Sequence, residues 1–575
     1  MIKKLFPFVK GYGVRAILAS VTVVCEVLIE VYIPYLMADI INIGIAQGDT
    51  AFILRRGLLM IGMAFLSLAM GALSARFASV SSAGFAKNLR GALFGRVQSF
   101  SFANVDHFST ASLVTRLTTD VNNVQNSFMM IIRTLVRSPV MLVAATVMAV
   151  RISPDMAMVF AFALPALGIC LGLIISKTYP RFKAMLKKFD AMNASVQENL
   201  TAIRVVKAFV RGDYEQKRFN ASAEDVRATQ IKAEKLLILN MPIAQYILYV
   251  CMIAVCYIGG VKIVEGQMMT GDLMSFISYI GQILSALMMI SMMMVMLVLT
   301  KASCSRIVEV LDEVPSIRDD PDKGDPQVMD GSVEFEDASF SYSGNGDNLT
   351  LSHVNLSIRA GETIGVIGGT GSAKTSLVQL IPRLYDVYSG RVKVGGKDVR
   401  DYKIETLRKS VSMVLQKNVL FSGTIRENLR WGDPNATDAE LEAACHAAAA
   451  DGFIRSFPDG YDTDLGQGGV NVSGGQKQRL CIARALISKP KIIILDDSTS
   501  AVDTATDAAI RKALREQLRG TTAIIIAQRI TSVMDADRIV VLDDGKISDV
   551  GTHEDLMRRS EIYREVYESQ QKGVA

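Results

Sequence analysis

Six apolar windows, each about 20 residues long, constrain the fold of this chain more than any other feature of its sequence. They lie near 16–38, 57–79, 131–151, 154–176, 241–262 and 272–299. A helix of this length crosses the hydrocarbon core of a bilayer, where every backbone polar group needs a partner within its own segment. Half of the residues are hydrophobic and the mean hydropathy is +0.29. The windows therefore predict a membrane domain of six transmembrane helices over 1–312.

Basic residues are distributed unequally between the segments that flank these windows. On one side, three segments contain 4, 4 and 13 Lys and Arg residues, and these segments are 1–15, 80–130 and 177–240. The connections on the other side contain only Arg55, Arg56 and Arg151. Because basic connecting segments stay in the cytoplasm, we expect a multi-pass protein of the cytoplasmic membrane, in contact with lipid. Its N-terminus and its C-terminal half would lie in the cytoplasm.

Charge and cysteine content exclude several other classes of protein. The net charge is only +5, and the basic residues do not cluster with aromatic residues as in a nucleic-acid groove. Nucleic acid is therefore not an expected partner. The seven cysteines have no regular spacing, so they predict neither a disulfide framework nor a metal site.

The character of the chain changes after residue 312. A stretch rich in Asp, Pro and Gly over 313–330 has the composition of a linker. From 331 to 575, short β-rich runs such as TIGVIG and KIIILDD alternate with helical stretches. This alternation predicts an α/β domain with a largely parallel sheet. The expected fold is thus a membrane α-helical domain followed by a soluble α/β domain.

The stretch IGGTGSAKTS follows a strand-like run and has the features of a phosphate-binding loop. A Gly-rich turn between strand and helix directs backbone N–H groups and a helix N-terminus towards phosphates. Lys374 would neutralise the phosphate charge, and Thr375 would ligate Mg²⁺. The template G-x-x-x-x-G-K-[ST] fails only at Ala373. The residues of the loop are Gly368, Gly369, Thr370, Gly371, Ser372, Ala373, Lys374, Thr375 and Ser376.

Further motifs in the soluble half accompany this loop. The run KIIILDD predicts a buried strand that ends in carboxylates, of which Asp496 would hold Mg²⁺ and Asp497 would lie where a general base is needed. NVSGGQKQRL is a polar, Gly-rich turn that opens a helix, and Gln416 lies in VLQKNVLF.

In their order and spacing, these motifs resemble the ATP-binding cassette (ABC) family of P-loop ATPases. The six-span half resembles the exporter-type transmembrane domain of the same family, so the resemblance covers the whole chain. It implies ATP and Mg²⁺ as ligands, with Tyr342 stacked on adenine and Gln416 at the Mg²⁺. Residues 465–469 resemble the segment that contacts the coupling helices, which we expect near 107–118 and 210–220. The family's signature turn matches Ser473, Gly474, Gly475 and Gln476, preceded by Val472 in place of the usual Leu.

The resemblance also implies contacts with a second cassette. In the family, two cassettes pack head to tail, and each ATP lies between one phosphate loop and the opposite signature turn. Asp503, in SAVD, matches the loop that crosses to the opposite nucleotide site.

Three positions at the phosphate end depart from the family pattern. Asp497 replaces the catalytic glutamate and is one methylene shorter, whereas a general base must come within about 3 Å of its water. Gln528 replaces the switch histidine and cannot exchange a proton as imidazole does. Ala373 adds a methyl group, which we expect to be a mild change because alanine starts a helix readily.

These departures, beside an intact signature turn, predict a heterodimer with a second half-transporter. The site of this chain would bind ATP and hydrolyse it slowly, while the partner supplies the regular catalytic residues for the other site. Three alternatives remain open. The chain could form a homodimer in which Asp497 and Gln528 still work slowly, an importer of siderophore-like metabolites, or an ATP-gated channel or regulatory subunit.

Two features of the apolar half concern the transported compound. Glu26 and Glu30 lie one helical turn apart in the first span, either along a path for cationic cargo or paired with Arg133 or Arg137. The sixth span contains LMMISMMMVM, whose flexible thioethers would suit the wall of a polyspecific cavity, with Met289 and Met293 along the path. Helix packing or lipid contact is the alternative role for these methionines. The pattern favours a small lipophilic or amphiphilic compound, such as a drug, a lipid or a peptide.

Overall fold

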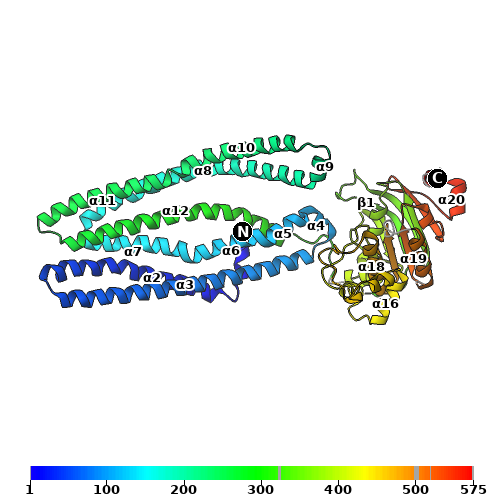
Figure 1. Ribbon diagram of the computed structural model, residues 1–575, viewed down its shortest axis with the longest axis horizontal. Coiled ribbons are helices and arrows are strands. Elements are labelled where there is room, and N and C mark those ends of the chain that lie inside the picture. Colours follow the sequence, from blue (N-terminus) through cyan, green and yellow to red (C-terminus); the bar gives the residue numbers. More distant parts are fainter. Residues whose placement is uncertain (1, 321–325, 498–503, 518–519, 573–575) are drawn as a thin grey trace. The chain divides into compact units, whose positions relative to one another are not determined.

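The computed structural model describes residues 2–320, 326–497, 504–517 and 520–572. The chain divides into two compact units. The helical unit comprises Met1–Gln98 and Thr110–Glu313, and the sheet unit comprises Ser99–Ser109 and Val314–Ala575. Figure 1 shows long helices in the first and packed strands and helices in the second.

Six helices among the described residues are long and apolar enough to cross a membrane. They are Gly13–Ile45, Thr50–Gln98, Thr110–Ile152, Pro154–Thr201, Gly212–Val264 and Thr270–Met293. Each begins at or before one of the six apolar windows, and the last continues to Asp312. The predicted set of six long apolar helices is therefore confirmed.

The elements of the helical unit follow one another with few breaks. They are α1 (Ile2–Leu5), η1 (Phe6–Val9), α2 (Gly13–Asp39), η2 (Ile40–Ile45), α3 (Thr50–Gln98), α5 (Thr110–Thr115), η3 (Arg116–Asp120), α6 (Val121–Met130), η4 (Ile131–Leu135), α7 (Val136–Ile152), α8 (Pro154–Thr201), α9 (Ile203–Ala208), α10 (Gly212–Leu237), α11 (Asn240–Val264) and α12 (Thr270–Asp312). Helix α2 packs along α3, and α8 packs along α10 (Figure 1). A Cβ at Gly71 of α3 would lie 3.0 Å from Glu26 Oε1, so this glycine permits α3 to approach α2 closely.

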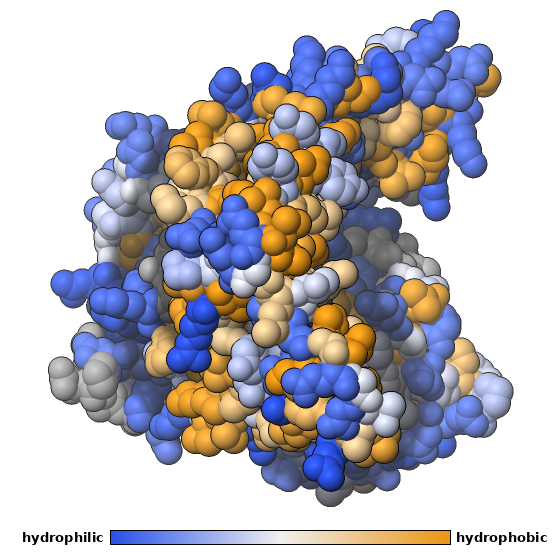
Figure 2. Space-filling model, turned by 90° about the vertical axis from the view of Figure 1, so that its left-hand side faces the viewer, coloured by the Kyte–Doolittle hydropathy of each residue, from blue (hydrophilic) through white to orange (hydrophobic). Residues whose placement is uncertain are grey.

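The core of the helical unit lies where α2, α7, α8, α11 and α12 meet. Phe276 of α12 stacks on Phe160 of α8 with ring centroids 5.4 Å apart. The buried Tyr279 donates its hydroxyl to Val31 O at 2.9 Å. Figure 2 shows many hydrophobic side chains on the outer surface of the helices, and large exposed ones include Phe65 and Phe162. Such a surface suits contact with lipid.

The described part of the sheet unit contains a four-stranded and a six-stranded sheet. The order of the first is β2-β1-β4-β5 and that of the second is β10-β9-β3-β8-β7-β6. In the second sheet all neighbours are parallel except β10, which runs antiparallel to β9. The predicted α/β domain with a largely parallel sheet is thus confirmed. The strands are β1 (Val333–Phe340), β2 (Leu351–Ile358), β3 (Thr363–Gly368), β4 (Ser389–Val394), β5 (Lys397–Asp398), β6 (Val411–Val414), β7 (Ile492–Asp496), β8 (Thr522–Ile526), β9 (Arg538–Asp543) and β10 (Lys546–Gly551).

Helices cover the sheets and contribute to two large cores. The helices of this unit are α4 (Phe102–Phe108), α13 (Lys374–Gln379), η5 (Val399–Asp401), α14 (Ile404–Ser410), α15 (Ile425–Leu429), α16 (Asp438–Ala447), α17 (Asp451–Ser456), η6 (Gly460–Asp462), α18 (Gly474–Ile487), α19 (Thr504–Gln517), η7 (Ile530–Ser532), α20 (His553–Arg559) and α21 (Glu561–Lys572).

The two short connecting helices lie before the positions expected for them. Helix α4 ends at Phe108 and α9 ends at Ala208, whereas we expected turns near 107–118 and 210–220. Capping sets the first position: Asn104 N donates to Ser101 Oγ, and Ser101 N donates to Asn104 Oδ1. Residues 212–220 instead form the first turns of α10.

Candidate nucleotide site

The phosphate loop connects β3 to α13, as its sequence predicts. The ammonium of Lys374 lies inside the loop, where Nζ donates to Gly368 O and Gly369 O at 2.8 Å each and to Ser372 Oγ at 3.3 Å. A cation and a helix N-terminus are thus brought to one point. This arrangement suits a bound polyphosphate.

Ala373 has a left-handed backbone, with φ 68° and ψ 24°, at the N-cap of α13. Our expectation of a mild change was therefore incomplete, because the strain comes from the backbone and not from helix initiation. A side chain in the left-handed region costs about 1 kcal/mol relative to glycine. The loop keeps its shape at some expense of stability.

Both carboxylates lie at the carboxyl end of β7, and Gln528 follows the end of the neighbouring strand β8. β7 and β8 are parallel with Asp496 opposite Ile526, so Asp497 and Gln528 follow at the same edge of the sheet. Asp497 has φ 48°, and its backbone N–H donates to Ile526 O at 3.0 Å. Ligands of open α/β sheets bind at this edge. The fold thus brings the strand-end carboxylates together with Gln528.

The surroundings of Asp496 fit a magnesium ion. Asp496 is only 2% exposed, and its Oδ2 finds no hydrogen-bond donor within the described part of the chain. Burial raises its pKa, an effect that a hydrogen bond from Thr375 opposes. Burial also lowers the pKa of Lys374, against the opposing charges of Asp496 and Asp497. Asp496 and Thr375 would hold Mg²⁺, which would offset phosphate charge when bound.

Gln528 contacts Asp497 directly. Its Nε2 donates to Asp497 Oδ2 at 2.8 Å. The amide can donate to an anion, but it cannot take up or release a proton as a histidine does. The two departures from the family's catalytic pair are therefore hydrogen-bonded to each other.

Gln570 of α21 holds the segment that carries Gln528, and no motif in the sequence predicted this role. Gln570 Nε2 donates to Gln528 O at 2.7 Å, and Ile530 N donates to Gln570 Oε1 at 2.9 Å. Gln570 lies 42 positions along the chain from Gln528 and belongs to no motif. Only the packing of α21 reveals this contact.

Tyr342 lies beside the phosphate loop with half of its side chain exposed. Its hydroxyl shares a hydrogen bond of 2.9 Å with Ser376 Oγ, and its ring meets that of Tyr385 edge-on at 5.2 Å. A ring that is 52% exposed can stack on a base. Tyr385 in turn donates to Asp106 Oδ2 of α4 at 2.7 Å, and burial together with this bond raises the pKa of Tyr385. This link to α4 was also missed in the sequence.

The remaining predicted nucleotide residues lie on other elements. Gln416 is exposed after the end of β6. Ser473 caps α18, where it and Gln476 exchange hydrogen bonds of 2.8 and 3.3 Å. Lys477 Nζ donates to Gly468 O at 2.8 Å. These bonds join the signature turn to itself and to residues 465–469, not to the phosphate loop. Asp503 lies outside the described residues.

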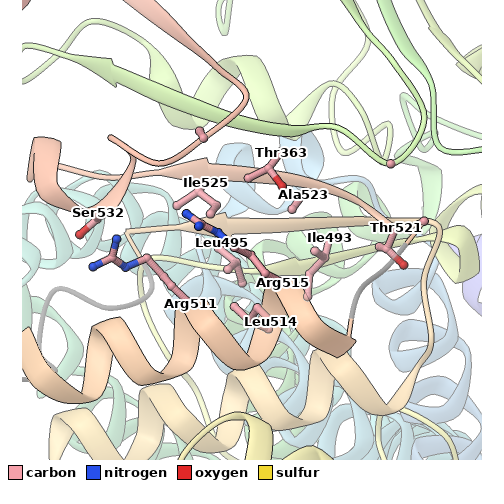
Figure 3. Close-up of a pocket in the computed structure, with 13 residues that line it drawn as sticks. Thr363, Ile493, Leu495, Arg511, Leu514, Arg515, Thr521, Ala523, Ile525 and Ser532 are labelled. Atoms are coloured by element: carbon pink, nitrogen blue, oxygen red, sulfur yellow. The ribbon is translucent and has the colours of Figure 1, made fainter. Parts of the chain in front are cut away.

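A cavity of about 330 Å³ lies between α19 and the strands of the parallel sheet. Figure 3 shows Arg511 and Arg515 of α19 facing Ile493, Leu495 and Ile525. Its lining extends from Thr363 at the start of β3 to Leu495 and Ile525, each one residue before the end of its strand. Arg511 Nη1 donates to Thr531 O at 2.8 Å. Among the described residues, its lining includes neither the phosphate loop nor Asp496, Asp497 or Gln528.

The charged residues of the first span form an ion pair network. Arg137 of α7 contacts Glu26 Oε1 through Nη1 and Glu30 Oε2 through Nη2, each at 2.5 Å. Of the two arginines that the sequence offered, Arg137 is therefore the partner. On α12, Met289 is half-exposed, whereas Met293 is buried within the helical unit.

An apolar helical unit joined to a unit with this phosphate loop and these strand-end carboxylates defines an ATP-driven membrane transporter. The family model of the ABC transporter transmembrane region matches residues 16–287, and the model described as ABC transporter matches residues 351–500. The chain is 38% identical over 569 residues to the uncharacterized ABC transporter ATP-binding protein YfiB of Bacillus subtilis, covering 99% of this chain and 98% of that protein. This chain therefore belongs to the ABC transporter family.

Two further similarities involve a lipid flippase and a solved exporter. The ATP-dependent lipid A-core flippase of Desulfotalea psychrophila is 29% identical over 573 residues, covering 99% of each chain. The structure of a bacterial Atm1-family ABC exporter with ATP bound superposes with a TM-score of 0.85 at 24% identity, covering 97% of this chain and 99% of that one. The two units thus share the fold of an ABC exporter on a single polypeptide.

Proposed function

We propose that this chain is one half of a heterodimeric ABC exporter and carries the site of low hydrolytic activity. ATP would bind at Lys374, Thr375 and Asp496 of this chain, and the partner's site would perform most of the hydrolysis. The signature turn of this chain would complete the partner's site. Binding would close the two cassettes, and hydrolysis and release would reopen them.

The hydrogen bond between Gln528 and Asp497 carries this proposal. An efficient base must receive a proton from the attacking water. Asp497 is one methylene shorter than glutamate, and its Oδ2 already accepts a hydrogen bond of 2.8 Å from an amide. That amide cannot relay a proton. The pair is therefore poorly suited to cleave a triphosphate held at Lys374.

The proposed cargo is a lipophilic or amphiphilic compound, moved out of the cytoplasm across the cytoplasmic membrane. The exporter fold and the similarity to a lipid flippase support this direction and this class of compound. The basic segments 1–15, 80–130 and 177–240 support a cytoplasmic N-terminus and a cytoplasmic sheet unit.

The proposal is tested with the chain alone and with a half-transporter encoded beside it, each in nanodiscs. Nucleotide binding is measured with a fluorescent ATP analogue, and turnover is measured as phosphate release. We expect the chain alone to bind Mg²⁺ and ATP but to turn over about 100-fold more slowly than the pair. Asp497→Asn should change the turnover of the pair by no more than about twofold.

Asp544→Asn provides a matched control for Asp497→Asn. Asp544 is exposed in the turn between β9 and β10 and has φ 42°, close to the 48° of Asp497. The two substitutions therefore make the same change of charge at residues with similar positive φ. If the chain alone turned over as fast as the pair, and lost this activity with Asp497→Asn but not with Asp544→Asn, a working homodimer would replace our proposal.

A further inference from the structure

A cavity of about 400 Å³ with polar groups in a largely apolar wall lies in the membrane-spanning part of the helical unit, between α2, α7 and α12. Its wall combines charged and amide groups with hydroxyls and thioethers. Prominent lining residues are Glu30, Arg137, Ser138, Met141, Gln282 and Met289. Neither ATP binding nor hydrolysis explains such a site between transmembrane helices.

The charges beside this cavity do not cancel. Arg137 contacts both Glu26 and Glu30 at 2.5 Å, so one cation faces two carboxylates and the group has an excess negative charge. Ionisable groups within a membrane span are paired or functional. Both terminal nitrogens of Arg137 already contact carboxylates. The excess charge therefore favours a cation.

Two buried oxygen atoms of this region have no donor within the described residues. They are Glu26 Oε2 and Gln282 Oε1. Buried acceptors are nearly always paired, and each exception calls for a donor. Gln282 lines the cavity itself, and Glu30 uses only Oε2 to contact Arg137. A ligand with N–H groups would meet the carboxylate of Glu30 and the side chain of Gln282, whose buried oxygen lacks a donor among the described residues.

The opposite part of the wall is apolar. Met141, Ala286 and Met289 come from α7 and α12. Methionine side chains are flexible and adapt to hydrocarbon groups of different shapes. The cavity thus offers a polar and a non-polar surface side by side.

We propose that this cavity binds an amphiphilic ammonium cation whose N–H groups donate to Glu30 and Gln282, while its hydrocarbon part lies along Met141 and Met289. The inference rests on the proposed export function and names its class of substrate. Glu26 acts through Arg137 as a positioning residue, because it holds the guanidinium against Glu30.

The test is equilibrium binding of radiolabelled amines to the full-length chain in nanodiscs, with empty nanodiscs as the correction for partition into lipid. The probes are decylammonium, decyltrimethylammonium and decanoate, which share one tail. Decylammonium should bind, decyltrimethylammonium should bind about tenfold more weakly because it has no N–H group, and decanoate should not compete.

Three variants locate the site. Glu30→Gln should weaken decylammonium binding about tenfold, and Gln282→Leu should have a similar effect without touching the ion pairs. Glu265→Gln, an exposed carboxylate of the same unit, makes the same change of charge outside the cavity and should leave binding unchanged. If Glu30→Gln lowers the thermal transition temperature of the protein, the effect of Gln282→Leu on decylammonium binding becomes the test of the site.

The outcomes separate this inference from the proposed function. Equal affinity for decylammonium and decanoate, or unchanged affinity in both Glu30→Gln and Gln282→Leu, would overturn the cation site. Fluorescent ATP binding and turnover are measured on the same samples. Slow ATP turnover by the chain alone without selectivity for cations would refute only the proposed substrate class. Fast ATP turnover by the chain alone would refute the heterodimer and would not affect the proposed cation site.

Discussion

Replacing Arg137 with Met should destabilise the helical unit strongly. The substitution removes the only cation that contacts both Glu26 and Glu30 among the described residues. Glu26 is 13% exposed and would keep an unpaired charge, whereas Glu30 is 35% exposed and would be partly screened by water. Removing one partner of a buried ion pair costs about 3–5 kcal/mol. Because water partly screens Glu30, we count mainly the cost of leaving Glu26 unpaired. We therefore expect a loss of about 3 kcal/mol from the free energy of unfolding.

A second substitution should restore much of this loss. Arg137→Met combined with Glu26→Gln removes the uncompensated charge and should recover about 2 kcal/mol relative to Arg137→Met alone. Arg151→Met is the control, since Arg151 is exposed in the last turn of the same helix. It should change stability by no more than about 0.5 kcal/mol.

Unfolding of the helical unit is followed through the reaction of buried Cys251 with a maleimide, in a chain whose other six cysteines are replaced by serine. Denaturing detergent is titrated into the micelles, and the midpoint of Cys251 exposure is recorded. Because Cys251 of α11 lies in the core of the helical unit, its labelling reports unfolding of this unit and not of the sheet unit. Equal midpoints for Arg137→Met and Arg151→Met, or a double variant no more stable than Arg137→Met, would contradict the cost of an unpaired Glu26.

Three further predictions concern the nucleotide site. Gln570→Ala should speed hydrogen exchange of the backbone amide that Gln570 holds in the Gln528 segment by about fivefold, for a lost bond of about 1 kcal/mol, and unchanged exchange would contradict the positioning role. Ala373→Gly should raise the stability of the sheet unit by about 1 kcal/mol in thermal unfolding, whereas a decrease would contradict the strain. Burial raises the pKa of Asp496 above its ordinary value of 3.8, so on acidification this carboxylate takes up its proton at a pH above 3.8. The protonated side chain no longer ligates Mg²⁺. Without Mg²⁺, the contribution of Asp496 to stability is therefore greatest at low pH and is lost as pH rises through the raised pKa. Mg²⁺-dependent ATP binding that persists undiminished down to pH 3.8 would contradict the raised pKa.

Local patterns in the sequence determined much of the architecture. The length of an apolar window depends only on bilayer thickness, so six windows sufficed to predict six spans. The phosphate loop is likewise one contiguous strand, turn and helix, and its Lys374 lies where the motif requires. A strand that ends in Asp496 and Asp497 places both at the carboxyl edge of a parallel sheet.

Contacts between distant residues were decided by the tertiary structure alone. The choice of Arg137 over Arg133 as the partner of Glu26 depends on how α7 packs against α2, across 111 positions of sequence. The contact of Gln528 with Asp497 depends on the adjacency of β7 and β8. No periodicity or motif encodes such pairings, because they depend on the relative placement of whole elements. Backbone conformation was hidden for a related reason: the left-handed turn at Ala373 is imposed by the loop that surrounds it, against the preference of the residue itself.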